Sequence, residues 1–148
     1  MLKLTFNILA ICGAAGFSGV MICIGLTLGS YWHSLPAQDF LNWFAANNGF
    51  VARSVPIIVF PTLIGFGGSL WTSWNTDEFL LWTISTGCVL FVLILTMAFF
   101  VPSNTPFANG SVDPAQVPAK LTLWLRFHTL RIAIAMVAAA AGIIALSK

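Results

Sequence analysis

Charged residues are the scarcest class in this 148-residue chain, where Lys and Arg total 6 and Asp and Glu total 4. Their share is 7%, against roughly 25% in soluble domains. A water-exposed surface needs more charge than this, and a net charge of +2 is too small to bind nucleic acid. The composition therefore excludes a soluble globular domain and a nucleic-acid-binding protein.

Residues that bind metals or form crosslinks are also few. The three cysteines, Cys12, Cys23 and Cys88, are scattered through apolar stretches without a CxxC spacing, which predicts free, buried thiols and no disulfide framework. Two histidines, His33 and His128, could hold a haem or a copper ion. Two protein ligands are too few to hold a metal ion firmly, so we expect no metal or other cofactor. A site formed by the two histidines stays an alternative.

Long apolar runs dominate the sequence, which is 59% hydrophobic with a mean hydropathy of +0.95. A membrane-spanning helix needs about 20 mostly apolar residues. The run after Arg131 is shorter than that, so the last helix must begin earlier and carry His128 and Arg131 into the membrane. We predict one all-α integral membrane domain over residues 1–148, an up-and-down bundle of four transmembrane helices at about 4–30, 54–73, 79–101 and 121–146.

The connections differ in character. Between helices one and two, the segment from Ser34 to Gly49 has Pro36 in its first turn and several large apolar residues, which predicts a short interfacial helix. Residues 102–120 contain four prolines and predict an irregular loop that acts as a lid. In an up-and-down bundle these two connections lie on the same side of the membrane.

Small residues and prolines predict how the helices pack. The pairs Ala15–Gly19 and Gly25–Gly29 have the small-xxx-small spacing that lets helices approach closely. Pro56 and Pro61 predict a kink in helix two. The first apolar run is longer than that of a signal peptide, so we expect it to be a retained helix.

One stripe of functional side chains is predicted on helix four. Trp124, His128 and Arg131 recur at i, i+4 and i+7 and share a helix face, whereas Arg126 points away. Ionisable residues at membrane depth are costly and usually functional. The topology adds residues from the same side of the membrane, and the candidate site comprises Trp32, His33, Asn104, Trp124, His128 and Arg131.

Three motifs resemble a known family. They are Ala14-Ala-Gly16-Phe-Ser-Gly19, Val101-Pro-Ser-Asn104 and Trp124-x-Arg126-x-His128-x-x-Arg131, and together they resemble the anthrone oxygenase-like family of small four-helix membrane proteins. The resemblance spans most of the chain. It implies an activity found in some members, the oxygenation of an anthrone to an anthraquinone without metal or flavin. Many members have no established activity, so the resemblance constrains the fold better than the substrate.

The chemistry of such a reaction suggests roles for the stripe. An anthrone that loses a proton becomes an enolate that reduces O2, so the enzyme needs a base and a cationic cradle. We expect His128 to be the base, Arg131 to hold the enolate oxygen, Asn104 to orient the ketone and Trp124 to stack on the flat substrate, with His33 as a second base. Alternatively, Arg and Trp mark a helix entry by snorkelling and aromatic belts, and Asn104 is a turn residue.

A second class of function is a non-catalytic accessory subunit of a larger membrane redox complex, or a homo-oligomer, lining a quinone, lipid or haem site. A cavity that reaches His128 would favour the enzyme, whereas an accessory chain would fill that space. A transporter has less support, because no span carries an acidic residue and no inverted repeat is evident. From the compact bundle and the absence of a recognisable targeting sequence, we expect a bacterial inner membrane location. The distribution of Lys and Arg predicts that the site side faces the cytoplasm.

Overall fold

The computed structural model describes the backbone of residues 1–148 and all side chains except those of Val51 and Ser54. Four of its helical segments are long and apolar enough to cross a membrane. The predicted all-α fold with four membrane-spanning helices is therefore confirmed. The elements are α1 (Leu2–Cys23), η1 (Ile24–Leu28), α2 (Gly29–Ser34), α3 (Ala37–Thr72), α4 (Phe79–Leu95), η2 (Thr96–Phe100), α5 (Val101–Ala108), η3 (Pro114–Gln116) and α6 (Val117–Leu146).

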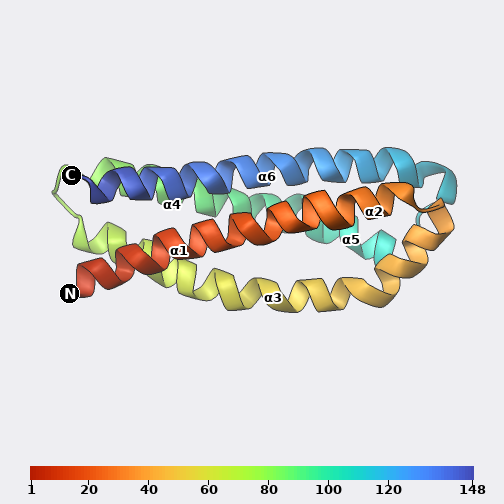
Figure 1. Ribbon diagram of the computed structural model, residues 1–148, viewed down its shortest axis with the longest axis horizontal. Helices are drawn as coiled ribbons and strands as arrows, with labels where there is room; N and C mark the ends of the chain where they lie inside the picture. Colours follow the sequence, from red (N-terminus) through yellow and green to blue (C-terminus); the bar gives the residue numbers. More distant parts are fainter.

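The two ends of the bundle carry different parts of the chain (Figure 1). Both termini and the α3–α4 connection lie at one end, which we call the terminal end. The α2–α3 and α5–α6 connections lie at the other, which we call the loop end. The segment between the first two spans is helical as predicted, and it forms the first part of α3, which crosses the loop end before α3 turns along the bundle.

The prediction of an irregular lid over residues 102–120 is wrong for most of that segment. The chain stays helical to Ala108, and η3 begins at Pro114. Pro102 follows the π-helical turn η2 within a helix that runs without a break from Phe79 to Ala108, and the shifted hydrogen bonds of such a turn accommodate a residue without an N–H. A short turn follows α5, with Gly110 at a φ of 66°.

Small residues pack the terminal end. A Cβ on Gly65 of α3 would lie 2.3 Å from the backbone nitrogen of Ala10 in α1, so these helices touch backbone to backbone. Ala138 of α6 and Trp82 of α4 are fully buried beside this contact. The predicted pair Ala15–Gly19 is exposed and makes no such contact, which corrects that part of the packing prediction.

The cysteines are free, as predicted, but two of them are not buried. Cys12 and Cys23 are exposed and Cys88 is half-buried. Their apolar surroundings in the sequence reflect contact with lipid as much as contact with protein, because both environments select the same residue types.

Candidate functional site

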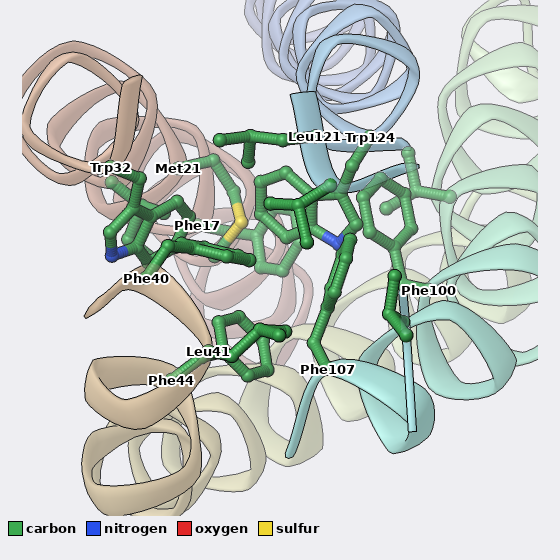
Figure 2. Packing of buried hydrophobic residues seen from close by; sticks show 14 of the residues in the cluster. Phe17, Met21, Trp32, Phe40, Leu41, Phe44, Phe100, Phe107, Leu121 and Trp124 are labelled. Carbon is green, nitrogen blue, oxygen red and sulfur yellow. The ribbon is translucent and has the colours of Figure 1, made fainter. Parts of the chain in front are cut away.

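An aromatic cluster closes the loop end, formed by Trp32, Phe40, Phe44, Phe107 and Trp124 (Figure 2). Their rings converge from α2, α3, α5 and α6. Most contacts are edge to face: the centroids of Trp32 and Trp124 lie 5.6 Å apart at 78°, and those of Phe40 and Phe107 lie 5.1 Å apart at 85°. This geometry is favoured between aromatic rings, so the cluster ties four helices together.

A cavity of about 300 Å³ adjoins the cluster, between α1, α3, η2 with α5, and α6. Its walls include Ala52 and Pro56 of α3, and Met97 and Val101 of η2 and α5, all four of which are exposed on the protein surface. Pro56, Met97 and Val101 belong to membrane-spanning segments. The cavity therefore opens sideways, between α3 and the η2–α5 helix, toward the hydrocarbon of the bilayer.

Arg131 is the charged residue in the cavity wall, with 7% of its surface exposed. Its Nη2 donates to Nδ1 of His128 at 2.8 Å, and its Nη1 donates to Oγ1 of Thr96 at 3.3 Å. The guanidinium carbon lies 3.8 Å from the centre of the Phe100 ring, a cation–π contact. Its Nε is buried and has no hydrogen-bond partner among the described side chains. The guanidinium is fixed in place while part of its donor capacity is unused.

No carboxylate neutralises this buried cation among the side chains that the structure describes. The ion pair found there joins Nζ of Lys3 to Oε2 of Glu78 at 2.7 Å, at the terminal end. A buried, unpaired charge is costly, and an anion or a strongly polarised oxygen relieves that cost. The cavity is thus suited to a ligand that carries or develops negative charge on oxygen.

His128 has both ring nitrogens occupied. Because a guanidinium only donates, Nδ1 of His128 must accept from Arg131, and a neutral imidazole then carries its hydrogen on Nε2. This Nε2–H donates to the carbonyl of Met21 at 2.7 Å. The ring is 1% exposed, lies outside the cavity wall and stacks against Trp124, with centroids 4.9 Å apart. In this arrangement His128 orients Arg131, and neither nitrogen has a free lone pair for a substrate proton.

Two π-helical turns flank the His128–Arg131 pair. In η1, a Cβ on Gly25 would lie 3.2 Å from Cδ2 of His128, so the glycine lets α1 approach the imidazole. In η2, Thr96 and Phe100 both contact Arg131. Such turns shift a helix register locally and are frequent at functional sites.

Asn104 lies on α5 and not in a turn, which corrects the alternative interpretation of this residue. Its Oδ1 accepts from Nε1 of Trp124 at 2.8 Å. The indole only donates, so the amide oxygen must face it and the amide NH2 is left to donate. Asn104 and Asn48 both line the cavity. The cavity thus offers donors from Asn104 and Arg131 to an oxygen-bearing ligand.

The predicted site residues divide into three groups. Trp32, Asn104, Trp124 and Arg131 line the cavity, whereas His128 lies behind Trp124 and His33 is exposed on α2. The indole nitrogen of Trp32 is buried without a hydrogen-bond partner among the described side chains. Within the part of the chain that the structure describes, no group of three or more His, Cys, Asp or Glu residues is placed to hold a metal ion.

Three further residues line the cavity and were not predicted from the sequence: Thr96, Phe100 and Asn48. Thr96, Phe100 and Asn104 are spaced four residues apart, so they lie on one face of the third span, and this spacing would have linked the threonine to the predicted asparagine. Asn48 lies in the segment predicted as an interfacial helix, where a polar residue is expected without any function.

Fold and site together define a four-helix membrane protein with a bilayer-facing cavity and a buried, uncompensated arginine. A family model described as anthrone oxygenase matches residues 40–141, and the chain belongs to the anthrone oxygenase family. The match includes Asn104 and the Trp124–Arg131 stripe, and it leaves α1 and its glycine pattern outside. Neither a curated protein nor a solved structure matches the chain.

Proposed function

We propose that this protein oxidises a flat phenolic ketone of the anthrone class with O2 in the cavity at the loop end, and that Arg131 binds the oxygen that becomes negative. The observation that carries the proposal is a buried guanidinium without a carboxylate, lining a cavity of about 300 Å³. Pockets for small molecules begin at about this size. Membership of the anthrone oxygenase family supports the substrate class.

The reaction divides into steps that need little from the protein. Loss of a proton from the CH2 group opposite the ketone gives an enolate, whose oxygen Arg131 and the NH2 of Asn104 stabilise. The enolate passes one electron to O2, and the radical and superoxide combine to form a carbon–oxygen bond. The peroxide takes up a proton and eliminates water as the second C–H bond breaks. Anthrone and O2 thereby give anthraquinone and one water, and no metal or other cofactor enters these steps.

The hydrogen bonds at His128 argue for a positioning role in this mechanism. His128 holds Arg131 through Nδ1 and is itself held by the carbonyl of Met21. The substrate proton then passes to water or hydroxide in the cavity, and the electrostatic effect of Arg131 makes the carbon acid strong enough for this transfer. His33 is exposed and outside the cavity wall, so we give it no role in the chemistry.

The alternative of a non-catalytic accessory subunit has less support. A cavity that reaches His128 was expected for the enzyme, and the cavity found here reaches Trp124 and Arg131 of the stripe but not His128. It still leaves space beside the stripe that an accessory chain was expected to fill with side chains. Its sideways opening suits a nonpolar aromatic or quinone-like ligand that dissolves in the bilayer. We further propose that the protein lies in a bacterial inner membrane with the loop end toward the cytoplasm.

The decisive experiment compares two arginines on α6. The purified protein in nanodiscs is supplied with anthrone in air, and quinone absorbance is followed above the rate of uncatalysed oxidation in empty nanodiscs. We expect Arg131→Met to lower kcat about 10²- to 10³-fold, as for the removal of an oxyanion donor. The control, Arg126→Met, alters an exposed arginine and should leave the rate unchanged. No turnover by the natural protein, or full activity of Arg131→Met, would contradict the proposal.

A further inference from the structure

A second, much smaller cavity of about 20 Å³ lies next to the substrate cavity. Phe17, Val59 and Leu93 line both cavities, so the two share a wall. Ala135 lines the smaller one and follows Arg131 by four residues on α6, which places it about 6 Å further toward the terminal end. The small cavity is therefore adjacent to the site at which the substrate would react.

The walls of this small cavity are apolar. Ala14 of α1 and Ala135 of α6 are both buried and supply only methyl groups. The polar residue in its wall, Thr62, donates its hydroxyl hydrogen to the carbonyl of Ile58 at 2.6 Å. A water molecule needs about two to four polar partners, and apolar cavities stay dry and take up apolar gases instead.

The size of the cavity limits its occupant. A cavity of about 10–15 Å³ holds one water molecule, so a cavity of about 20 Å³ admits one small molecule. Val59, Val89 and Leu93 of its wall are only half-buried and belong to membrane-spanning segments, so the cavity is open to the bilayer on that side. Dioxygen is small, apolar and more soluble in hydrocarbon than in water, and Ala14, Val59 and Ala135 all belong to membrane-spanning segments, where the dissolved gas collects.

We propose that this cavity, the oxygen chamber, binds O2 and supplies it to the substrate past the shared wall residues Phe17, Val59 and Leu93. The proposal rests on the proposed function, because that reaction consumes O2. An enolate reacts with O2 only on encounter, and a site one helical turn from Arg131 raises the frequency of that encounter. The chamber binds the oxidant in this account, and no bond is formed or broken there.

Xenon tests the chamber without any turnover, because it is an apolar atom that enters dry apolar cavities. The probe is xenon itself, followed by ¹²⁹Xe NMR on the protein in nanodiscs, with empty nanodiscs as the reference. We expect the natural protein to change the ¹²⁹Xe chemical shift in a way that saturates with xenon concentration. Ala135→Leu should abolish this change, because its side chain fills the chamber. The control Ala133→Leu adds the same atoms at an exposed position of α6 and should retain the shift. Absence of the shift in the natural protein would overturn the proposal.

The dependence of the oxidation rate on O2 concentration tests whether the chamber supplies O2 to the reaction. We expect Ala135→Leu to raise the KM for O2 about tenfold, equivalent to about 1.4 kcal/mol, and to leave the KM for anthrone unchanged. Val92→Ala enlarges the chamber and should strengthen xenon binding, which keeps the test valid if Ala135→Leu does not fold. An unchanged KM for O2 in a folded Ala135→Leu protein would overturn the proposal. Xenon binding without anthrone turnover would overturn the proposed function and, with it, the delivery of O2 to the substrate. Turnover without xenon binding would overturn the chamber and leave the proposed function standing.

Discussion

The loop end and the terminal end of this bundle each have a cluster of buried apolar side chains, and the two clusters pack differently. At the terminal end, Gly65 and Ala10 bring two backbones into contact, and Ala138 and Trp82 fill the remaining space. At the loop end, α3 diverges from α1 (Figure 1), and large rings such as Trp32 and those of the rest of the aromatic cluster fill part of the space between the helices. Close backbone approach leaves no room for a ligand, whereas a frame of rings surrounds a cavity.

The same contrast explains where the charges lie. Lys3 and Glu78 neutralise each other at the terminal end. Arg131, at the inner side of the loop end, is buried with a histidine, a threonine and a phenylalanine ring as its neighbours. A charge that is paired inside the protein has little to offer a ligand, and one that is not paired is available to it. Variants at each end can test this difference.

After Arg131→Met, the largest effect is expected at His128, where two substitutions separate positioning from base catalysis. His128→Phe leaves Arg131 and the carbonyl of Met21 without their partner and should lower kcat about 10²-fold. His128→Gln offers an oxygen to Arg131 and an NH2 to Met21, yet it cannot accept a substrate proton. We expect its kcat to stay within about tenfold of the natural value, and steady-state oxidation of anthrone measures both.

A general base at His128 predicts another pattern. Removal of a general base typically lowers kcat about 10²- to 10⁴-fold, and His128→Gln would then lower kcat as much as His128→Phe does. Equal losses in the two variants, with helical content and thermal stability unchanged, would restore the base role that the sequence suggested.

At the terminal end, the next effect is on stability and not on activity. Gly65→Ala places a Cβ 2.3 Å from the backbone nitrogen of Ala10, and backbone cannot rotate away. We expect a loss of about 1–3 kcal/mol in the free energy of unfolding, as for an overpacked core, measured by denaturant titration in mixed micelles.

Gly67→Ala is the matched control for this change. Its Cβ would meet no atom within 4 Å, so the variant should unfold like the natural protein or slightly later, because alanine favours helix. Equal behaviour of the two alanine variants would show that α1 and α3 are not in backbone contact at the terminal end.

The sequence predicted some of these features and could not predict others, for physical reasons. The stripe of Trp124, His128 and Arg131 was predictable because helical spacing and the short apolar run after Arg131 are local properties. The helix through Pro102 was not, because it depends on the π-helical turn before it. The acceptor for Nε2 of His128 is a backbone carbonyl 107 residues away, so only the packed bundle reveals that the imidazole is fully engaged.

The smallest effect concerns the ion pair of the terminal end. A hydrogen bond from Lys3 is the main cause that lowers the pKa of the Glu78 carboxyl below its ordinary value. A lowered folded-state pKa contributes stability that is complete above the pKa of the unfolded state, about 4.3 for Glu, and is lost as the pH falls through the folded-state value.

Glu78→Gln should therefore destabilise the protein slightly near pH 7, by about 0.2–1 kcal/mol, because the pair is partly exposed and screened by salt. The difference from the natural protein should shrink below about pH 4, where Glu78 itself becomes protonated. Thermal unfolding of both proteins at pH 7 and pH 3 measures this difference, and anthrone turnover at pH 7 should be the same for both. A change in turnover as large as that of His128→Phe would mean that the two ends of the bundle are coupled, against the separation that the packing supports.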